Sequence, residues 1–357
     1  MHALHHGGWA GLILACSCAC ASAGLWYVND ATDPGEDGSA AHPFDTIAEA
    51  IAAAQPGDEV VVDDGVYAGP GNKDLDLLGK QIVLRSLNGP SNTQIDCEGV
   101  GRALVLQSGE TTNTVIRGFR ITGANTSVLV EVGAPGPGVY TRIYDTNGSA
   151  IVCRQSGFTM EDCVVEQSQA MTYRTEVQVG IPGDSEVVFQ SVADGSGGGL
   201  FGEACDVVLR NVQFRGCSAG GHGGALALWS NSTAYLENCT VESNTAGLDH
   251  TQRTVRIGWQ SSPGSYAETD IVNSSGGGGG IFLEHSALAL SNVTVRGNAA
   301  GRAGGGVYAV SSSVLRVEGG AIEDNYVWST IPSPAGGGIA VVESEADLQD
   351  LVIRRNT

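Results

Sequence analysis

The stretches NCTVESN (238–244) and NVTVRGN (292–298) decide how this chain folds, because the same seven-residue pattern recurs along most of it. The further copies are GFRITGA (118–124), DCVVEQS (162–168), NVQFRGC (211–217), GGAIEDN (319–325) and DLVIRRN (350–356). Their starts differ by 44, 49, 27, 54, 27 and 31 residues. A spacing of 27 residues is too short for a pair of helices and suits a coil of short strands. The repeat predicts stacked units, each burying its apolar face against its neighbours.

Within each copy the second and fourth positions are mostly apolar, so they share the inner face of a strand. The fourth position is occupied by Ile121, Val165, Phe214, Val241, Val295, Ile322 and Ile353. Large and β-branched side chains of this kind suit a packed, pleated surface. Cys163 and Cys239 occupy the second position, two levels apart, which is roughly 9.6 Å and too far for a disulfide. We expect both cysteines to be buried as small apolar side chains.

The fifth position alternates in charge from the second copy onward: Glu166, Arg215, Glu242, Arg296, Glu323 and Arg354 follow Thr122. Equivalent residues of stacked parallel strands lie roughly 4.8 Å apart, where opposite charges attract and like charges repel. The alternation predicts that consecutive copies are direct neighbours in space and that the outward ladder fixes their register. The seventh position ends in Asn244, Asn298, Asn325 and Asn356, a residue suited to turns and to stacked side-chain hydrogen bonds.

A glycine run precedes a further apolar strand in each later coil: 197–199, 223–224, 276–280, 304–306 and 336–338. Near the N-terminus, Asp45 or Thr46 can begin a helix whose apolar face carries Phe44, Ile47, Ile51 and Ala54. Such a helix can cap the open end of an apolar cylinder. The predicted organisation is a signal segment (1–23), a cap with the first coils (24–95), and coils with one-sided insertions (96–357).

Residues 1–23 resemble a secretory signal, with an apolar core and a small-x-small site, Ala21-Ser22-Ala23. Leu-Ala-Cys at 14–16 leaves a lipoprotein cleavage box as an alternative. The chain has no further apolar stretch long enough for a membrane-spanning helix. The predicted location is therefore secreted or cell-surface. The chain stops inside a repeat, so we expect that it is a fragment or continues into another assembly.

The opening of the chain, Tyr27-Val28-Asn29-Asp30 with His42-Pro43-Phe44-Asp45-Thr46-Ile47, resembles the start of right-handed parallel β-helix proteins of the pectate-lyase-like superfamily. The Gly-Gly runs followed by x-x-Asn turns are similar to the repeats of chlamydial polymorphic outer membrane proteins. These resemblances imply an all-β, right-handed parallel β-helix, a solenoid with an N-terminal capping helix. They leave activity open, because the superfamily contains lyases, hydrolases, epimerases, tailspikes and adhesins.

The extra residues of the long repeats all follow the seventh position and precede the glycine run, so they project from one side of the stack. Insertions on one face often form the binding surface of a solenoid. The predicted binding residues, aromatic rings beside polar groups that suit sugars, are Tyr140, Tyr144, Tyr173, Asp249, His250, Arg253, Arg256, Trp259, Tyr266 and Asp270. The alternative is a self-packed loop with aromatic anchors.

Acidic residues of the N-terminal loop, Asp30, Asp33, Glu36 and Asp37, are the candidates for binding calcium, with a solvated loop as the alternative. No other cofactor is predicted. Gly221-His222-Gly223 resembles the Gly-His-Gly of polygalacturonase-type hydrolases, although the matching paired-Asp region, Glu161-Asp162, is poor. The net charge is −21, from 39 acidic and 18 basic residues, which disfavours nucleic acid and anionic membranes as partners.

Two functions remain open from the sequence. The first is a β-helix that binds a polysaccharide, a cell-surface glycan or a protein through its inserted loops, as an adhesin or extracellular structural module. The second is a polysaccharide-active enzyme: a calcium-dependent lyase or an epimerase, with a glycoside hydrolase less favoured.

Overall fold

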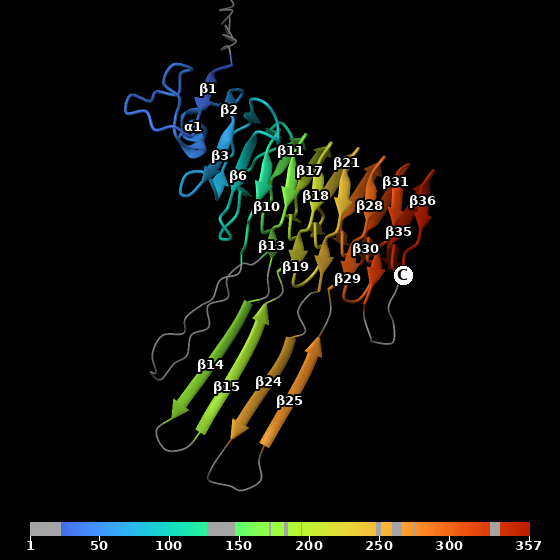
Figure 1. Ribbon diagram of the computed structural model, residues 1–357. Coiled ribbons are helices and arrows are strands. Elements are labelled where there is room, and N and C mark those ends of the chain that lie inside the picture. The colour runs from blue at the N-terminus through green and yellow to red at the C-terminus, as the bar shows by residue number, and fades with distance from the viewer. Residues whose placement is uncertain are drawn as a thin grey trace, which may run out of the picture.

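The computed structural model of the protein describes residues 23–126, 147–170, 173–181, 185–193, 195–247, 251–258, 266–273, 276–328 and 336–357. For the strands between 173 and 193 and between 251 and 273, the description covers the backbone. Figure 1 shows short strands stacked side by side along one axis, with a helix at the N-terminal end. Residues 1–22 of the expected signal lie outside the described residues.

One coil of the chain passes through four sheets before it returns to the first. The coil that begins with β17 (Asp206–Arg210) continues through β18 (Gln213–Arg215), β19 (Ser218–Ala219) and β20 (Leu226–Trp229), and β21 (Thr233–Glu237) starts the next coil. Each strand pairs in parallel with its equivalent in the next coil, as in β17 with β21. The predicted all-β, right-handed parallel β-helix is confirmed.

Sheets 1 and 2 are the two longest sheets of the described chain, and sheet 2 carries the repeat that dominates the sequence. Sheet 1 is ordered β1 (Leu25–Val28), β2 (Glu59–Val62), β5 (Val83–Ser86), β8 (Val115–Arg117), β11 (Gly157–Glu161), β17, β21, β27 (Ala287–Ser291), β31 (Val314–Glu318) and β35 (Glu345–Gln349). Sheet 2 is ordered β3 (Gly65–Ala68), β6 (Thr93–Asp96), β9 (Arg120–Thr122), β12 (Val164–Glu166), β18, β22 (Thr240–Glu242), β28 (Thr294–Arg296), β32 (Ala321–Glu323) and β36 (Val352–Arg354).

Two shorter sheets close the coil. Sheet 4 is ordered β13 (Gln169–Ala170), β19, β23 (Thr245–Ala246), β29 (Ala299–Ala300) and β33 (Tyr326–Val327). Sheet 3 is ordered β4 (Leu75–Asp76), β7 (Leu104–Leu106), β10 (Ile151–Arg154), β16 (Leu200–Glu203), β20, β26 (Ile281–Glu284), β30 (Val307–Val310) and β34 (Ile339–Val342). The glycine runs lie between sheet 4 and sheet 3, where the sequence predicts a corner.

The apolar core fills the inside of the coils and is closed at the N-terminal end by α1 (Ile47–Ala53). Thr46 is the N-cap of this helix, and with Glu49 it forms a capping box, which satisfies backbone N–H groups at the helix start. Ile47, Ala50 and Ile51 are buried in the core cluster of the coils. The predicted capping helix is confirmed, with Thr46 rather than Asp45 as its first cap residue.

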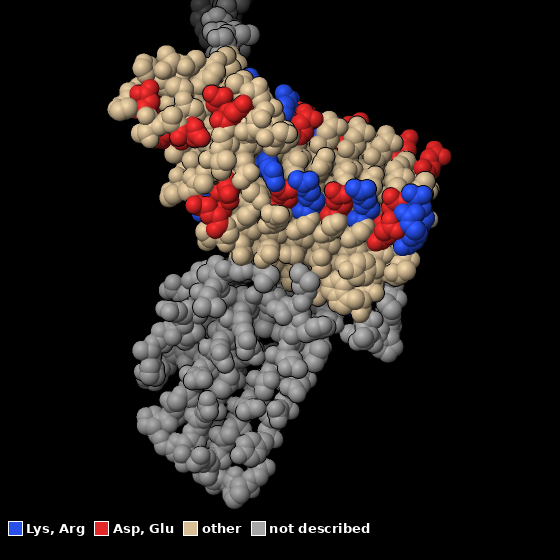
Figure 2. Space-filling model, in the orientation of Figure 1, with Lys and Arg blue, Asp and Glu red and all other residues tan. Residues whose placement is uncertain are grey.

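The fifth and seventh positions of the repeat form two parallel ladders. Figure 2 shows the fifth position as a row of alternating blue and red along the stack. Glu242 pairs in register with Arg215 on one side and Arg296 on the other, as predicted. At the seventh position the buried Asn244 side chain donates to Asn298 Oδ1 at 3.0 Å, and Asn298 donates to Asn325 Oδ1 at 2.9 Å. The predicted asparagine stacking is therefore confirmed.

The two longest insertions fold into β-hairpins that join each other. The first contains β14 (Tyr173–Ile181) and β15 (Ser185–Ala193), and the second contains β24 (Thr251–Gly258) and β25 (Tyr266–Asn273). β15 pairs antiparallel with β24, so the hairpin sheet is ordered β14-β15-β24-β25. In Figure 1 this sheet extends from the side of the stack that carries sheet 4. Both hairpins thus emerge from one side, as the position of the insertions predicts.

Candidate functional site: a groove on the outer edge of sheet 3

A surface groove of about 450 Å³ runs across the turns that connect sheet 3 to sheet 1. Its lining residues come from four consecutive coils and are Gln107, Arg154, Gln155, Glu203, Ala204 and Ser230. Gln155, Ala204 and Ser230 each have a positive φ, of 49°, 51° and 56°, which turns the chain sharply at the end of its strand. The stacked turns therefore bring Gln107, Gln155 and Ser230 to one edge of the stack, with Ala204 between the last two.

Arg154 and Glu203 form the charged part of the groove. They lie opposite each other in the register of β10 and β16, and Arg154 Nε donates to Glu203 Oε2 at 3.2 Å. The guanidinium of Arg154 lies 5.5 Å from the centroid of the Phe201 ring, within the range of a cation–π contact. The pair is a fixed set of donors and acceptors with no net charge, flanked by the amide groups of Gln107 and Gln155.

An aromatic layer covers the outer surface of sheet 3 beside this groove. Its residues are Val152, Phe201, Ala227, Phe282, Ala303, Tyr308 and Ala340, with Val105, Trp229 and Val310 packed against them. The turn glycines lie directly on it: a Cβ on Gly277 would be 2.2 Å from the Tyr308 ring. The glycine runs therefore do more than turn a corner, since the absence of side chains lets the backbone pack on the aromatic rings. The indole N–H of Trp229 is buried, and it has no hydrogen-bond partner in the described part of the chain.

His222 of the Gly-His-Gly sequence belongs to this layer. Its ring stacks on Phe282, with centroids 4.2 Å apart, and its Nδ1 accepts a hydrogen bond from the Gly277 N–H at 3.1 Å. Burial, with a smaller effect of nearby Arg302, lowers the pKa of His222 to about 4. The neutral imidazole thus joins two successive glycine turns. This arrangement gives His222 a structural role in the glycine turns.

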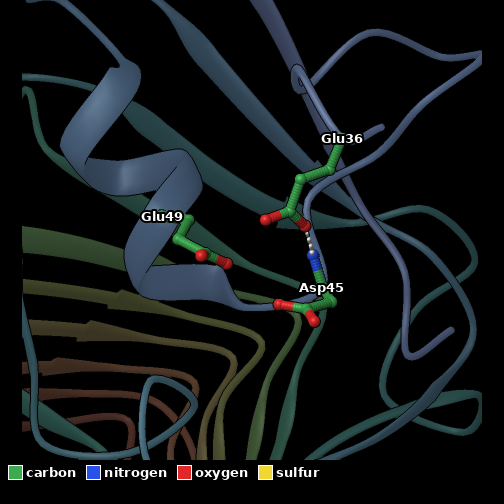
Figure 3. Close-up of side chains that lie close together, drawn as sticks. All are labelled: Glu36, Asp45 and Glu49. Carbon is green, nitrogen blue, oxygen red and sulfur yellow. Dashed lines mark hydrogen bonds between the residues drawn. The ribbon is translucent and has the colours of Figure 1, made fainter. Parts of the chain in front are cut away.

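A second group of ionisable residues lies at the N-terminal cap. Glu36, Asp45 and Glu49 have carboxylate oxygens within 4.8 Å of one another (Figure 3). Glu36 Oε2 accepts a hydrogen bond from the Asp45 N–H at 3.1 Å. Burial and a hydrogen bond with Glu49 raise the pKa of Asp45. Since Glu49 also completes the capping box of α1, the arrangement is accounted for by the helix start.

Of the predicted calcium-binding residues, Glu36 belongs to this carboxylate group, whereas Asp30, Asp33 and Asp37 do not. Asp33 accepts hydrogen bonds from the Gly35 N–H at 2.9 Å and from the His42 ring at 2.8 Å, and these contacts lower its pKa. Asp37 accepts from the Ser39 N–H at 2.9 Å. Asp30 lies against the backbone of Gly65, where a Cβ would be 2.8 Å from its carboxylate. Of the four, only Glu36 is close to two other carboxylates in the described residues, and those belong to Asp45 and Glu49.

The predicted binding residues divide between the hairpin sheet and positions that are not described. Tyr140, Tyr144, Asp249, His250 and Trp259 lie outside the described residues. Tyr173 begins β14; Arg253 and Arg256 lie on β24; Tyr266 and Asp270 lie on β25. In the register of the second hairpin Arg253 pairs with Ile271, Arg256 with Glu268, and Asp270 with Thr254. The strand pairing therefore brings four of these residues into a single hairpin.

The sequence interpretation missed the groove, although a signal for it exists. In the strands of sheet 3 the outward positions carry Phe201, Phe282 and Tyr308 where an exposed sheet face would carry polar residues. Apolar side chains on the outer face of a sheet indicate that this face is covered by other parts of the chain. The last outward residues of β10 and β16 are the charged Arg154 and Glu203, which indicates that this covered area ends there.

Comparison with known proteins identifies the family. A family model described as "Right handed beta helix region" matches residues 177–357, half of the chain. The chain belongs to this right-handed β-helix family. No curated protein matches the chain. The similarity of the repeats to chlamydial polymorphic outer membrane proteins stays a prediction.

Two solved structures are similar to the chain. One is a rhamnogalacturonan lyase with 12% identity, covering 91% of this chain and 87% of its own, at a TM-score of 0.37. The other is the pectate lyase Pel9A with 12% identity, covering 94% of this chain and 78% of its own, at a TM-score of 0.30. Neither similarity bears on activity. Among the described residues, no helix is long and apolar enough to cross a bilayer.

Proposed function

We propose that this protein is an extracellular β-helix that binds a neutral polysaccharide in the groove on the outer edge of sheet 3. The observation that carries the proposal is the Arg154–Glu203 pair, which lies beside Phe201 in a groove that Gln107 and Gln155 also line. Sugar hydroxyls both donate and accept hydrogen bonds, and this set supplies both in fixed positions. A volume of about 450 Å³ lies in the range of small-ligand sites.

The charge balance favours a neutral ligand over a polyuronate. Glu203 already neutralises Arg154, and the whole chain carries a net charge of −21. An anionic chain would approach an acidic protein against repulsion. The described groove residues include a single carboxylate, that of Glu203, whereas the calcium-dependent lyase alternative needs several to hold the cation. Binding is therefore preferred to elimination chemistry at this site.

The inserted hairpins supply the second part of the proposal, a platform beside the stack. The ends of the second insertion lie together, since a Cβ on Gly247 would be 2.9 Å from the Cα of Gly276. From Cys217 to Leu226 the chain takes nine steps and from Asn244 to Ile281 it takes 37, so removing 248–275 restores the short coil. This deletion removes the second hairpin, half of the platform, and is expected to leave both neighbouring coils intact.

The test is binding of the full chain to a panel of neutral and acidic polysaccharides by isothermal titration calorimetry. We expect binding to a neutral member, with affinity reduced at least tenfold by Arg154→Gln. Arg117→Gln is the matched control, because Arg117 forms a similar surface pair with Glu161 at 2.6 Å on sheet 1. The control is expected to change affinity less than twofold.

The deletion of 248–275 then tells whether the platform contributes. Loss of binding in the deletion, with Arg154→Gln unaffected, would move the site to the hairpins and overturn the groove proposal. A calcium-dependent rise in ultraviolet absorbance on an acidic polysaccharide would establish the lyase instead. Absence of binding across the whole panel also contradicts the proposal.

A further inference from the structure

Five of the six cysteines in the described part of the chain fall into two groups. Cys163, Cys217 and Cys239 are buried, and each thiol lies near backbone carbonyl oxygens, as Cys239 Sγ does at 3.3 Å from Glu237 O. Cys153 and Cys205 are also free thiols, but the register of sheet 3 brings them to adjacent levels of the stack, where each shifts the pKa of the other. Their relative exposures are 0% and 2%, so the contact is enclosed by the protein.

The register of sheet 3 explains how these two sulfur atoms meet. Cys153 on β10 lies opposite Gly202 on β16, and both positions face the interior of the coil. Because Gly202 has no side chain, the space above Cys153 is open, and the thiol of Cys205 enters it from the following turn. A Cβ on Gly202 would lie 2.5 Å from Cys205 Sγ. Paired strands are roughly 4.8 Å apart, so this places Cys205 Sγ directly over the Cys153 side chain.

Cys205 is also held in place from the other side. Its backbone N–H donates to Ser232 Oγ at 3.2 Å, and its Sγ lies 3.6 Å from the same oxygen. Ser232 in turn donates to Trp229 O at 2.7 Å. The turn that carries Cys205 is thus tied to Ser232 of the following coil. In the folded chain the contact with Cys153 lowers the pKa of the Cys205 thiol and raises that of Cys153.

We propose that Cys153 and Cys205 form a disulfide that joins two consecutive coils, one before and one after the first inserted hairpin. The oxidant is an external disulfide of the secretory route that the N-terminal segment predicts. The Cys205 thiolate attacks one sulfur of that disulfide and releases one thiolate. The Cys153 thiol, losing its proton to solvent, then displaces the second thiolate and completes the Cys153–Cys205 bond. Both sulfurs are buried in the folded chain, so the exchange takes place before this coil closes.

The bond would enclose the whole first insertion. The loop between Cys153 and Cys205 contains β14 and β15, so the crosslink ties the coil that precedes the hairpin to the coil that follows it. Disulfides that close long loops remove the most freedom from the unfolded chain. This gives a reason for a thiol pair at this level, where a long segment interrupts the regular coil.

Mass spectrometry of the full chain, made in an oxidising compartment and digested with trypsin without reduction, tests the bond directly. Cys153 lies in the tryptic peptide 143–154 and Cys205 in 175–210, and we expect these two as one linked species that reduction separates. Both peptides recovered unlinked and fully alkylated, or either linked to another cysteine, would overturn the proposal. This measurement needs no variant, so a folding failure cannot obscure it.

Thermal unfolding gives an independent readout. We expect reductant to lower the midpoint of the wild type by roughly 5–10 °C and to leave Cys153→Ser and Cys205→Ser unchanged. Cys163→Ser is the control, because Cys163 is equally buried without a thiol partner, and it is expected to keep the full response to reductant. A wild-type midpoint insensitive to reductant contradicts the proposal.

Discussion

The asparagine ladder and the charged ladder follow the same repeat two residues apart, yet they stand in opposite environments. Asn244, Asn298 and Asn325 are fully buried, and each bonds to the next coil through neutral groups. Arg296 and Arg354 of the charged ladder are more than half exposed. Figure 2 shows the row of alternating charges on the surface of the stack. A lost hydrogen bond costs most where water cannot replace it. The buried ladder therefore contributes stability, whereas the exposed ladder contributes register.

Asn298→Ala is expected to have the largest effect on the free energy of unfolding. Asn298 Nδ2 donates to Val241 O and to Asn325 Oδ1, and Asn298 Oδ1 accepts from the Asn244 N–H. The variant leaves several buried groups without partners, at about 3–5 kcal/mol in total. Urea unfolding measures this, with the exposed Asn113→Ala as control. A loss under about 1 kcal/mol would show that the buried ladder does not carry stability.

Glu166→Gln is expected to have the next largest effect on the free energy of unfolding, because Glu166 is the residue of the charged ladder that is buried. Its side chain is 4% exposed and accepts from Arg120 and Arg215. Removing its charge weakens the ion pairs of both guanidinium groups, at about 1.5–3 kcal/mol by the same unfolding measurement. If Glu166→Gln costs no more than an exposed ladder variant, burial is not what separates the two ladders.

Glu242→Gln is expected to cost only about 0.2–1 kcal/mol, because its partner Arg296 is 53% exposed. The loss should disappear at about 1 M salt, where charges are screened within roughly 3 Å. Exchanging both residues, Glu242→Arg with Arg296→Glu, keeps the pair but places Arg beside Arg215 and Glu beside Glu323. A double variant less stable than Glu242→Gln would show that the ladder acts beyond single pairs.

The smallest expected effect is a dependence on pH at the C-terminal coil. A hydrogen bond from Arg355 holds the pKa of Asp324 below its ordinary value of 3.8. A carboxyl with a depressed folded pKa stabilises the fold above its unfolded pKa, and this contribution is lost as the pH falls through the folded value. Asp324→Asn should therefore flatten part of the fall in melting temperature below about pH 4, and Asn298→Ala should leave that slope unchanged.

The repeat made the ladders predictable, because one period of sequence corresponds to one step of structure. The capping helix was predictable from its own cap residue, Thr46, and its apolar face. The sign alternation from Glu166 to Arg354 depends only on which residues are neighbours, and the register confirms it. The aromatic layer was not predicted. The glycines that cover it have no side chains, so they give no hydrophobic pattern that would indicate packing on a sheet. Cys153 and Cys205 also escaped prediction, because one lies in a strand and the other in a turn, so alignment of the repeats does not superpose them.

The hairpin sheet could not be predicted from the sequence, for a different reason. Its insertions follow no period, and the pairing of Val187 with Ile257 joins segments that the repeat does not relate. Only the side from which they emerge could be inferred, because that depends on the phase of the insertion within the coil. The groove likewise combines residues of four coils, each unremarkable within its own copy.

The pairing of β15 with β24 has a consequence for how such a chain can grow. A hairpin is two strands wide, and strands in a sheet repeat at roughly the same 4.8 Å as stacked coils. Two hairpins can therefore lie edge to edge, without strain at their roots, when they leave the stack from every second coil. The insertions before β16 and β26 meet this condition, with the short coil of β20 between them. The spacing of the coils thus matches the spacing of the strands in the hairpin sheet. Adding or removing a single coil between the two insertions would destroy this match.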